Sequence, residues 1–126
     1  MIMLDTHTLL WAFFKKDNIP DSTQKLIEET EKVYVSIASL WEISIKQSIG
    51  KLDIKSSIEE IAGICREEGI EILHIMPKHL DQIKLLPAVH NDPFDRFIIS
   101  QAMIENLTVI SKDHVFGDYD VKLIWD

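Results

Sequence analysis

Five acidic residues of this chain stand where oxygen ligands for a divalent cation would be expected. Each lies within three residues after a predicted strand, or on or at the start of a predicted helix; they are Asp5, Glu42, Asp92, Asp95 and Asp113. Hard cations such as Mg²⁺ and Mn²⁺ prefer oxygen ligands, and Mg²⁺ usually takes one or two carboxylates from a protein. Ionised carboxylates packed together repel one another unless a cation compensates their charge. Convergence of these side chains would therefore indicate a bound metal ion.

The elements that must position these acids follow from the hydrophobic pattern. Short apolar runs predict strands at residues 2–4, 32–36, 70–75, 107–110 and 121–125. Helical patterns lie between them, at residues 8–14, 20–31, 36–49, 57–69, 77–86 and 92–106. Strands separated by helices predict right-handed crossovers and a parallel sheet covered on both faces. We therefore predict an α/β fold, a three-layer α/β/α domain spanning residues 1–126 with a central parallel sheet of four to five strands.

The predicted acids gather at one edge of this sheet. Asp5 ends the first strand and Asp113 follows the fourth, so both emerge at the carboxyl edge, where open parallel sheets bind ligands. Glu42, on the helix after the second strand, is one step round from the apolar stripe and can lean over the same edge. Asp92 and Asp95 are three residues apart at the start of a helix and share a face.

Each acid also has a local explanation. Helix capping or turn formation accounts singly for Asp5, Asp92, Asp95 and Asp113. Glu42 has Lys46 four residues later, which is the favourable orientation for a helical ion pair. A cap is the favoured role for Asp92, which is therefore the weaker candidate ligand. These separate explanations do not account for the concentration of acids at one edge.

Composition restricts the function only in part. The chain has 21 acidic and 13 basic residues and a formal charge of −8, which argues against broad electrostatic adhesion to nucleic acid or anionic lipid. A nuclease is not excluded, because bound cations reverse the local field of clustered carboxylates. Cys65, the single cysteine, cannot form an internal disulfide, and the sequence shows no signal peptide or membrane span. We expect a soluble, cytoplasmic protein.

Other polar and aromatic residues carry weaker hypotheses. Arg96, Lys112 and His7 adjoin the acids and are candidates for binding substrate phosphate, although Arg96 and Lys112 can equally offset carboxylate charge. The roles of His7, His90 and His114 stay open, since no His/Cys spacing is typical of a zinc site. Four aromatic residues are expected in the core or a protein interface rather than in base stacking: Trp11, Phe13, Phe14 and Trp41.

Across essentially its whole length the chain resembles the PIN-domain family, and within it the VapC-type toxin ribonucleases of toxin–antitoxin pairs. The resemblance rests on four segments in the family's order: Leu4-Asp5-Thr6-His7, Ser39-Leu40-Trp41-Glu42-Ile43, Asn91-Asp92-Pro93-Phe94-Asp95-Arg96-Phe97-Ile98-Ile99 with Gln101-Ala102, and Ile110-Ser111-Lys112-Asp113. By motif position the family's four catalytic, metal-binding acids fall on Asp5, Glu42, Asp95 and Asp113. Asp92 is an additional acid. His7 replaces a small polar residue and Ser111 a threonine.

The resemblance implies a Mg²⁺- or Mn²⁺-dependent endoribonuclease with one or two ions in its site. The reaction would be in-line hydrolysis of an RNA phosphodiester by a metal-activated water. It further implies a homodimer, and a small antitoxin whose C-terminal segment occupies a groove beside the active site. The apolar first helix is a candidate surface for that partner, and ordinary core packing explains it equally well.

Two other functions compete with this interpretation. A receiver-like phosphoacceptor domain would need an acidic pair after the first strand, an aspartate closing the third and a lysine ending the last, and this chain offers only Asp5. An Asp-x-Asp phosphatase motif is also missing, because Asp5 is followed by Thr6 and His7. A catalytically inactive PIN-like binding or regulatory module stays open, although all four acids are present.

Overall fold

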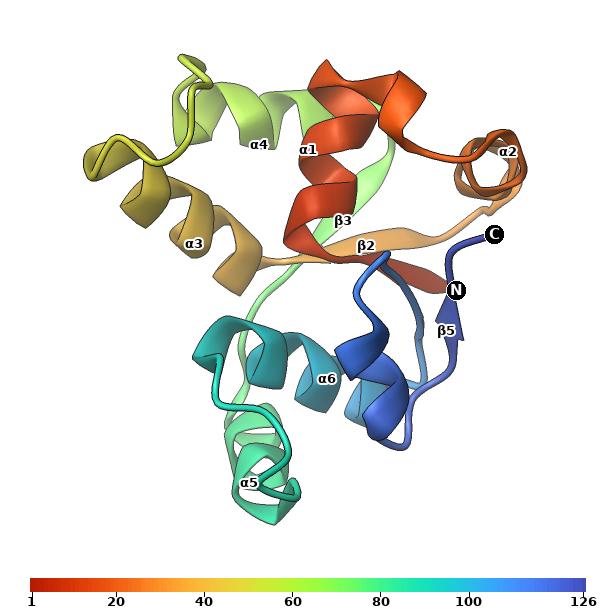
Figure 1. Ribbon diagram of the computed structural model, residues 1–126, viewed down its shortest axis with the longest axis vertical. Coiled ribbons are helices and arrows are strands. Elements are labelled where there is room, and N and C mark those ends of the chain that lie inside the picture. The colour runs from red at the N-terminus through yellow and green to blue at the C-terminus, as the bar shows by residue number, and fades with distance from the viewer.

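A parallel sheet of five strands forms the centre of the computed structural model, which describes residues 1–126 (Figure 1). The strand order is β3-β2-β1-β4-β5. The strands are β1 (Ile2–Leu4), β2 (Val33–Ser36), β3 (Ile70–Leu73), β4 (Thr108–Ile110) and β5 (Leu123–Ile124). Every neighbouring pair is parallel. The predicted α/β class with a parallel sheet of four to five strands is therefore confirmed.

Six α-helices flank the sheet. They are α1 (Thr6–Phe14), α2 (Asp21–Glu29), α3 (Ile37–Ser48), α4 (Ile58–Glu67), α5 (Pro77–Leu85) and α6 (Pro93–Glu105). Two short 3₁₀ helices, η1 (Lys16–Asn18) and η2 (His114–Asp118), occur where the sequence predicted only turns or loops. Figure 1 shows α1, α3 and α4 on one side of the sheet, and α5 and α6 on the other. None of these helices combines the length and apolar character needed to span a membrane.

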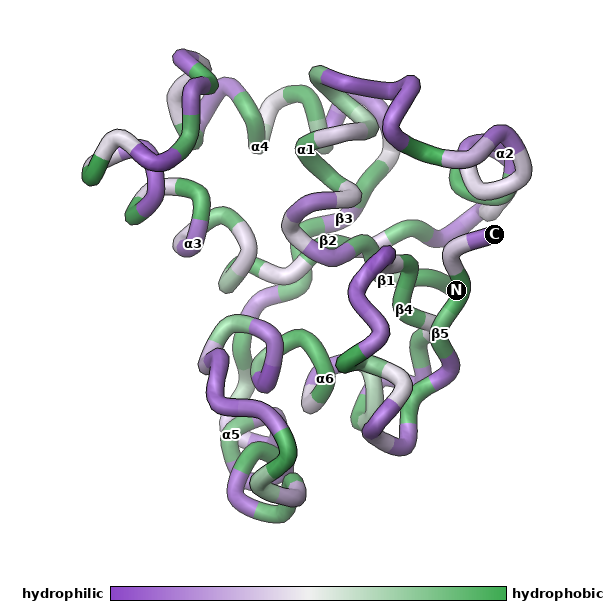
Figure 2. The backbone as a smooth tube through the Cα atoms, in the orientation of Figure 1, coloured by the Kyte–Doolittle hydropathy of each residue, from purple (hydrophilic) through white to green (hydrophobic).

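Side chains of β1 alternate between two hydrophobic cores, one on each face of the sheet. Ile2 and Leu4 pack with residues of α1, α3 and α4, whereas Met3 packs with residues of α6 and β4. All three are buried. Figure 2 shows the hydrophobic colour along the central strands and hydrophilic colour on the outer loops. Burial on both faces explains why β1 is a continuous apolar run in the sequence.

Local signals fix the ends of several helices. Ser57 and Glu60 form the predicted capping box at the start of α4, with both hydrogen bonds at 3.1 Å. Gly50 follows α3 with φ of 72°, a left-handed conformation that glycine adopts without strain. The first helix begins at Thr6, two residues earlier than predicted, because Asp5 caps it.

The apolar stripe predicted on α3 divides between core and surface. Leu40 and Ile43 are buried against the sheet. Trp41, Ile45 and Ile49, four residues apart, are 54%, 37% and 58% exposed. Trp41 was expected in the core or at a protein interface, and its exposure excludes the core, because its direction on the helix points away from the face that covers the strands.

Candidate active site

Asp5 occupies the centre of the carboxyl edge, directly after β1. Its Oδ1 accepts a hydrogen bond from the backbone N–H of Thr8 at 2.9 Å, and its Oδ2 accepts one from the Ser111 hydroxyl at 2.5 Å. The side chain is only 6% exposed, and this burial raises the pKa of Asp5 above its usual range, although the two hydrogen bonds oppose the rise. Asp5 is thus both the cap of α1 and a carboxylate at the sheet edge, so the two roles are compatible.

Ser111 joins Asp5 to the acid that follows the fourth strand. Its hydroxyl, which donates to Asp5, also accepts from the backbone N–H of Asp113 at 3.0 Å. Asp113 caps η2, because its Oδ1 accepts a hydrogen bond from the backbone N–H of Val115 at 3.0 Å. Asp5 and Asp113 line one pocket of about 220 Å³. The acids after β1 and β4 therefore meet at the same edge, as the strand order requires.

Glu42 faces the same region from α3. Its Oε1 accepts a hydrogen bond from the Thr6 hydroxyl at 2.7 Å, and Thr6 Oγ1 lies 2.9 Å from the Ser39 hydroxyl. Its Oε2 forms an ion pair of 3.0 Å with Lys46, as the spacing of four residues suggested. Glu42 is buried, at 7% exposure. Because Thr6 directly follows Asp5, the start of α1 ties the Glu42 carboxylate to the centre of the site.

Asp95 approaches from α6, which packs against α3. Its Oδ2 lies 2.9 Å from His90 Nε2. Burial raises the pKa of Asp95 to about 6; the hydrogen bond from His90 opposes this rise, whereas the nearby carboxylates of Asp92 and Glu42 add to it. Glu42 on α3 is therefore close enough to Asp95 on α6 for its negative charge to favour the protonated form of Asp95.

Asp92 has the capping role that the sequence favoured. Its Oδ1 accepts from the backbone N–H groups of Phe94 and Asp95, at 2.8 and 3.3 Å. One ligand atom each from His90, Asp92 and Asp95 lies within 4.8 Å of the others, the closest approach of three metal-binding side chains in the chain. No three of the four motif acids Asp5, Glu42, Asp95 and Asp113 come as close together.

The donor set nevertheless fits a hard cation. It is made of carboxylates, with His90 beside them and no cysteine nearby, which suits Mg²⁺ or Mn²⁺ better than a soft metal. Asp5 and Asp95 are both buried enough for their pKa values to rise, and a cation is the partner that would keep both ionised. The spread between the acids has a physical reason, since like charges separate and each carboxylate here is held by its own protein donor.

A sequence model of the PIN domain matches residues 2–122. The chain belongs to the PIN domain family. Proteins of this family are nucleases, and the match covers every acid of the candidate site. Comparison with curated proteins gives no match.

Several solved structures share the fold of this PIN domain. A chain of the VapBC2 complex of Rickettsia felis, bound to a fragment of its promoter DNA, aligns over 100% of both chains with a TM-score of 0.75 and 21% identity. A chain of the DNA-bound VapBC complex of Salmonella typhimurium aligns over 98% of both chains, with a TM-score of 0.69 and 16% identity. A chain of FitAcB from Neisseria gonorrhoeae aligns over 98% of this chain and 96% of its own length, with a TM-score of 0.64 and 21% identity.

The basic residues predicted to bind phosphate have different positions in this PIN domain. Lys112 and His7 are exposed and line the pocket that holds Asp5 and Asp113. Arg96 instead donates to three backbone carbonyls, those of Ile83, Pro87 and His90, at 3.1 to 3.3 Å. The Arg96 guanidinium thus stabilises the backbone of the segment that carries His90.

Sequence reasoning missed the groups that hold the acids of the PIN domain. Thr6, Ser39 and Ser111 are buried hydroxyl residues, and His90 is the partner of Asp95. Thr6 and Ser39 lie inside the two motif segments that contain Asp5 and Glu42, so their place in the motif was the available signal. Nothing in the spacing of His90 distinguishes it from His114, because its contact depends on how the loop before α6 folds.

Proposed function

We propose that this PIN domain is a metal-dependent endoribonuclease that hydrolyses RNA phosphodiester bonds. The observation that carries the proposal is the junction of Asp5 and Asp113 through Ser111, which brings the acids after two neighbouring strands into one pocket. Glu42 is tied to this junction through Thr6, the residue after Asp5, and Asp95 lies near enough to Glu42 for their charges to interact. The separate capping and ion-pair roles of these acids do not account for their concentration at one edge, because like charges repel one another.

The residues of the chain have distinct roles in this proposal. Asp5, Glu42, Asp95 and Asp113 would hold one or two ions of Mg²⁺ or Mn²⁺, with Asp92 as a weaker ligand. When bound, the metal supplies Lewis acidity and activates water for attack on the phosphodiester. The hydroxyls of Thr6 and Ser111 fix the directions of the Glu42 and Asp5 carboxylates. Lys112, which forms no ion pair within the chain, offers a positive charge for a phosphate oxygen.

Removal of the metal is expected to stop the reaction. We expect purified protein to cut a mixed RNA pool in Mg²⁺ or Mn²⁺, and cutting to fall to background when EDTA is in excess, because the carboxylates alone cannot activate water. Gel analysis of the RNA, with Mg²⁺ restored after EDTA as the control, measures this. Cleavage that continues unchanged in EDTA would contradict the proposal. A folded protein that binds Mn²⁺ and cuts no RNA would favour the inactive binding module.

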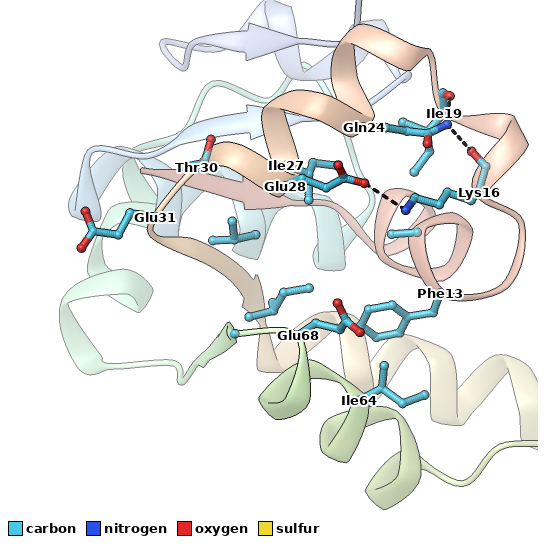
Figure 3. Close-up of a pocket in the computed structure, with 14 residues that line it drawn as sticks. Phe13, Lys16, Ile19, Gln24, Ile27, Glu28, Thr30, Glu31, Ile64 and Glu68 are labelled. Carbon is cyan, nitrogen blue, oxygen red and sulfur yellow. Dashed lines mark hydrogen bonds and ion pairs between the residues drawn. The ribbon is translucent and has the colours of Figure 1, made fainter.

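The toxin role and its antitoxin are part of the same proposal, supported by the similarity in fold to chains of the VapBC and FitAB complexes. Figure 3 shows a pocket of about 440 Å³ between α1, α2 and α4, at the amino end of the sheet. Phe13, Ile27 and Ile64 contribute to its apolar lining, and Glu31 and Glu68 to its acidic part. This lining suits an amphipathic segment with basic residues, so we place the C-terminal segment of the antitoxin here.

This pocket differs in position from the groove expected beside the active site. It lies at the far end of α1 from Asp5, so α1 would connect the docking segment to the site. The homodimer implied by the resemblance also belongs to the proposal, and the exposed stripe of Trp41, Ile45 and Ile49 on α3 offers it an apolar surface.

Charge reversal at the pocket is expected to weaken the complex with the proposed antitoxin. The double variant Glu31→Lys and Glu68→Lys should reduce affinity at least about 10-fold, because like charges replace the expected attraction. Light scattering of the co-expressed complex measures both the association and the number of copies. Glu67→Lys is the matched control, since Glu67 is exposed on α4 but does not line the pocket. Equal loss in the control would contradict the placement.

A further inference from the structure

The pocket at Asp5 and Asp113 has an aromatic wall whose role the acid chemistry leaves unexplained. Five residues line it, and Trp11 is the hydrophobic one among Asp5, His7, Lys112 and Asp113. Its volume of about 220 Å³ is smaller than a site for a drug-sized ligand, and it suits a single planar ring system. The wall therefore provides an apolar surface within the same pocket as two of the candidate metal ligands.

Neighbouring rings hold Trp11 in place. The His7 ring, one turn earlier on α1, lies 5.8 Å from the Trp11 ring with an interplanar angle of 37°. The Trp125 ring, after β5, also lies 5.8 Å from it, at 57°. Trp11 is only partly buried, so it stays available to the pocket while its position is fixed. A surface held in advance loses little conformational entropy when a ligand stacks on it.

The other side of the pocket carries charge suited to a nucleotide. The Lys112 ammonium is exposed and free of ion pairs within the chain, so it can meet a phosphate oxygen. The carboxylates of Asp5 and Asp113, at which cleavage is proposed, line the same pocket as this lysine. An aromatic wall beside a free cation is the combination by which proteins bind single-stranded nucleic acid.

We propose that this pocket holds one unpaired nucleobase of the RNA, stacked against Trp11 and His7, next to the phosphodiester that is cut. The proposal rests on the proposed function and deepens it by assigning a base-binding subsite, with Trp11 and His7 as its stacking surface. A base inside a duplex is paired and stacked, so it cannot enter the pocket without being pulled out of the helix. Trp11 is thus a specificity residue that selects RNA by its unpaired state.

A second aromatic pair flanks the acids from the other side and is the main rival. Trp41 packs edge-to-face on Phe94 with ring centroids 5.1 Å apart, beside Glu42 and Asp95. Trp41, however, is continuous with the exposed apolar residues Ile45 and Ile49, which suit a protein surface, and it is not among the residues that line the pocket of Asp5 and Asp113. The observations therefore favour Trp11 for the base.

Equilibrium binding of RNA tests the proposal independently of cleavage. A fluorescein-labelled single-stranded oligoribonucleotide and a hairpin containing the same sequence in its stem are titrated with full-length protein by fluorescence anisotropy. Ca²⁺ replaces Mg²⁺ to neutralise the carboxylates, and a gel after each titration verifies that the RNA is intact. We expect Trp11→Ala to weaken single-strand binding by about 5- to 150-fold, the range of one stacked base, and to leave hairpin binding unchanged.

Matched variants separate stacking from damage to the fold. Trp11→Phe keeps an aromatic ring and should retain most of the affinity, whereas Phe14→Ala removes an exposed aromatic from the same helix outside the pocket and should have no effect. Exposed His7 provides a second variant, His7→Ala, with a smaller loss in the same direction. In Mg²⁺, Trp11→Ala should raise KM for the single strand with little change in kcat, because the stack is present before and during the reaction.

Several outcomes would overturn the base subsite. The first is a Trp11→Ala variant that binds the single strand as tightly as the parent. The second is a loss of single-strand affinity in Phe14→Ala equal to that in Trp11→Ala, and the third is a loss found only in Trp41→Ala. The fourth is a parent protein that binds the hairpin as tightly as the single strand. If Trp11→Ala does not fold, two results together would overturn the subsite. They are a His7→Ala variant that binds the single strand as tightly as the parent, and a parent that binds an abasic oligonucleotide as tightly as the intact one. The two proposals fail separately: selective binding without cutting contradicts the nuclease, and cutting unaffected by Trp11→Ala contradicts the subsite.

Discussion

Replacing Asp5 with asparagine is expected to abolish RNA cleavage and to leave the fold intact. The amide keeps the oxygen that accepts from the Thr8 backbone N–H, so α1 stays capped, but it removes the negative charge that a cation needs. We expect a fall in rate on the order of 10³-fold or more, as when one member of a catalytic group acting as a unit is lost. Gel-based cleavage in Mg²⁺ and circular dichroism of the same preparation measure the two effects.

Stability gives an independent reading of the same variant. Burial raises the pKa of Asp5, so its contribution to stability is present at low pH and is lost as the pH rises through the folded-state pKa. At neutral pH the metal-free Asp5→Asn protein should therefore melt at the same temperature as the parent or higher. Asp53→Asn makes the same chemical change at an exposed position and should alter neither property. A clean Asp5→Asn preparation that cuts RNA as fast as the parent would remove Asp5 from the site.

Asp95→Asn is expected to abolish cleavage and to change how stability depends on pH. The pKa of Asp95 is raised from 3.8 to about 6, chiefly by burial. A raised pKa means that the metal-free parent loses stability as the pH rises between these two values, because the folded state must then release a proton that it holds more tightly than the unfolded state. The variant should lack this loss and should melt higher than the parent above about pH 6.

Thermal melts across this pH window, with and without Mg²⁺, measure the effect. Mg²⁺ should stabilise the parent by binding its folded state and should stabilise Asp95→Asn much less. Identical pH dependence in parent and variant would show that Asp95 stays ionised in the metal-free fold without cost. Asp92→Ala is the matched control on the same helix turn. It should lose about 1 kcal/mol of stability with the cap, and less activity than Asp95→Asn. Complete loss of cleavage with unchanged melting would instead place Asp92 among the metal ligands.

Hydrophobic pattern was sufficient to predict the centre of the sheet, because the three central strands β1, β2 and β4 are buried on both faces. The runs at Ile2–Leu4 and Thr108–Ile110 lack the alternation of apolar and polar residues that a half-exposed strand shows. Because helices separate the strands along the chain, the pattern favoured a parallel sheet. The outer face of α3 was not predictable in this way. Trp41 and Ile45 fit a core stripe by spacing, and only the position of the helix over the sheet decides that they are exposed.

For the candidate site, the sequence predicted which acids lie at the carboxyl edge but not what holds them. The position of Asp5 and Asp113 follows from strand ends, which a pattern can locate. The bond from Thr6 to Glu42 joins residues 36 positions apart, and that from Ser111 to Asp5 joins residues 106 apart. Such contacts depend on tertiary packing, as does the enclosure of Arg96 by three carbonyls. The residues next to Arg96 in the sequence therefore could not show whether it binds phosphate or holds the backbone.

The order of strands also has a consequence for the synthesis of the protein. The first strand, β1, is made earliest, yet it pairs with β4 as well as β2 in the finished sheet. A nascent chain on the ribosome therefore holds Asp5 at an open edge until residues 108–110 emerge, and Ser111 and Asp113 follow only after them. Shortened chains released before that point lack half of the acid junction. Under the proposed function, such shortened chains cannot cut RNA.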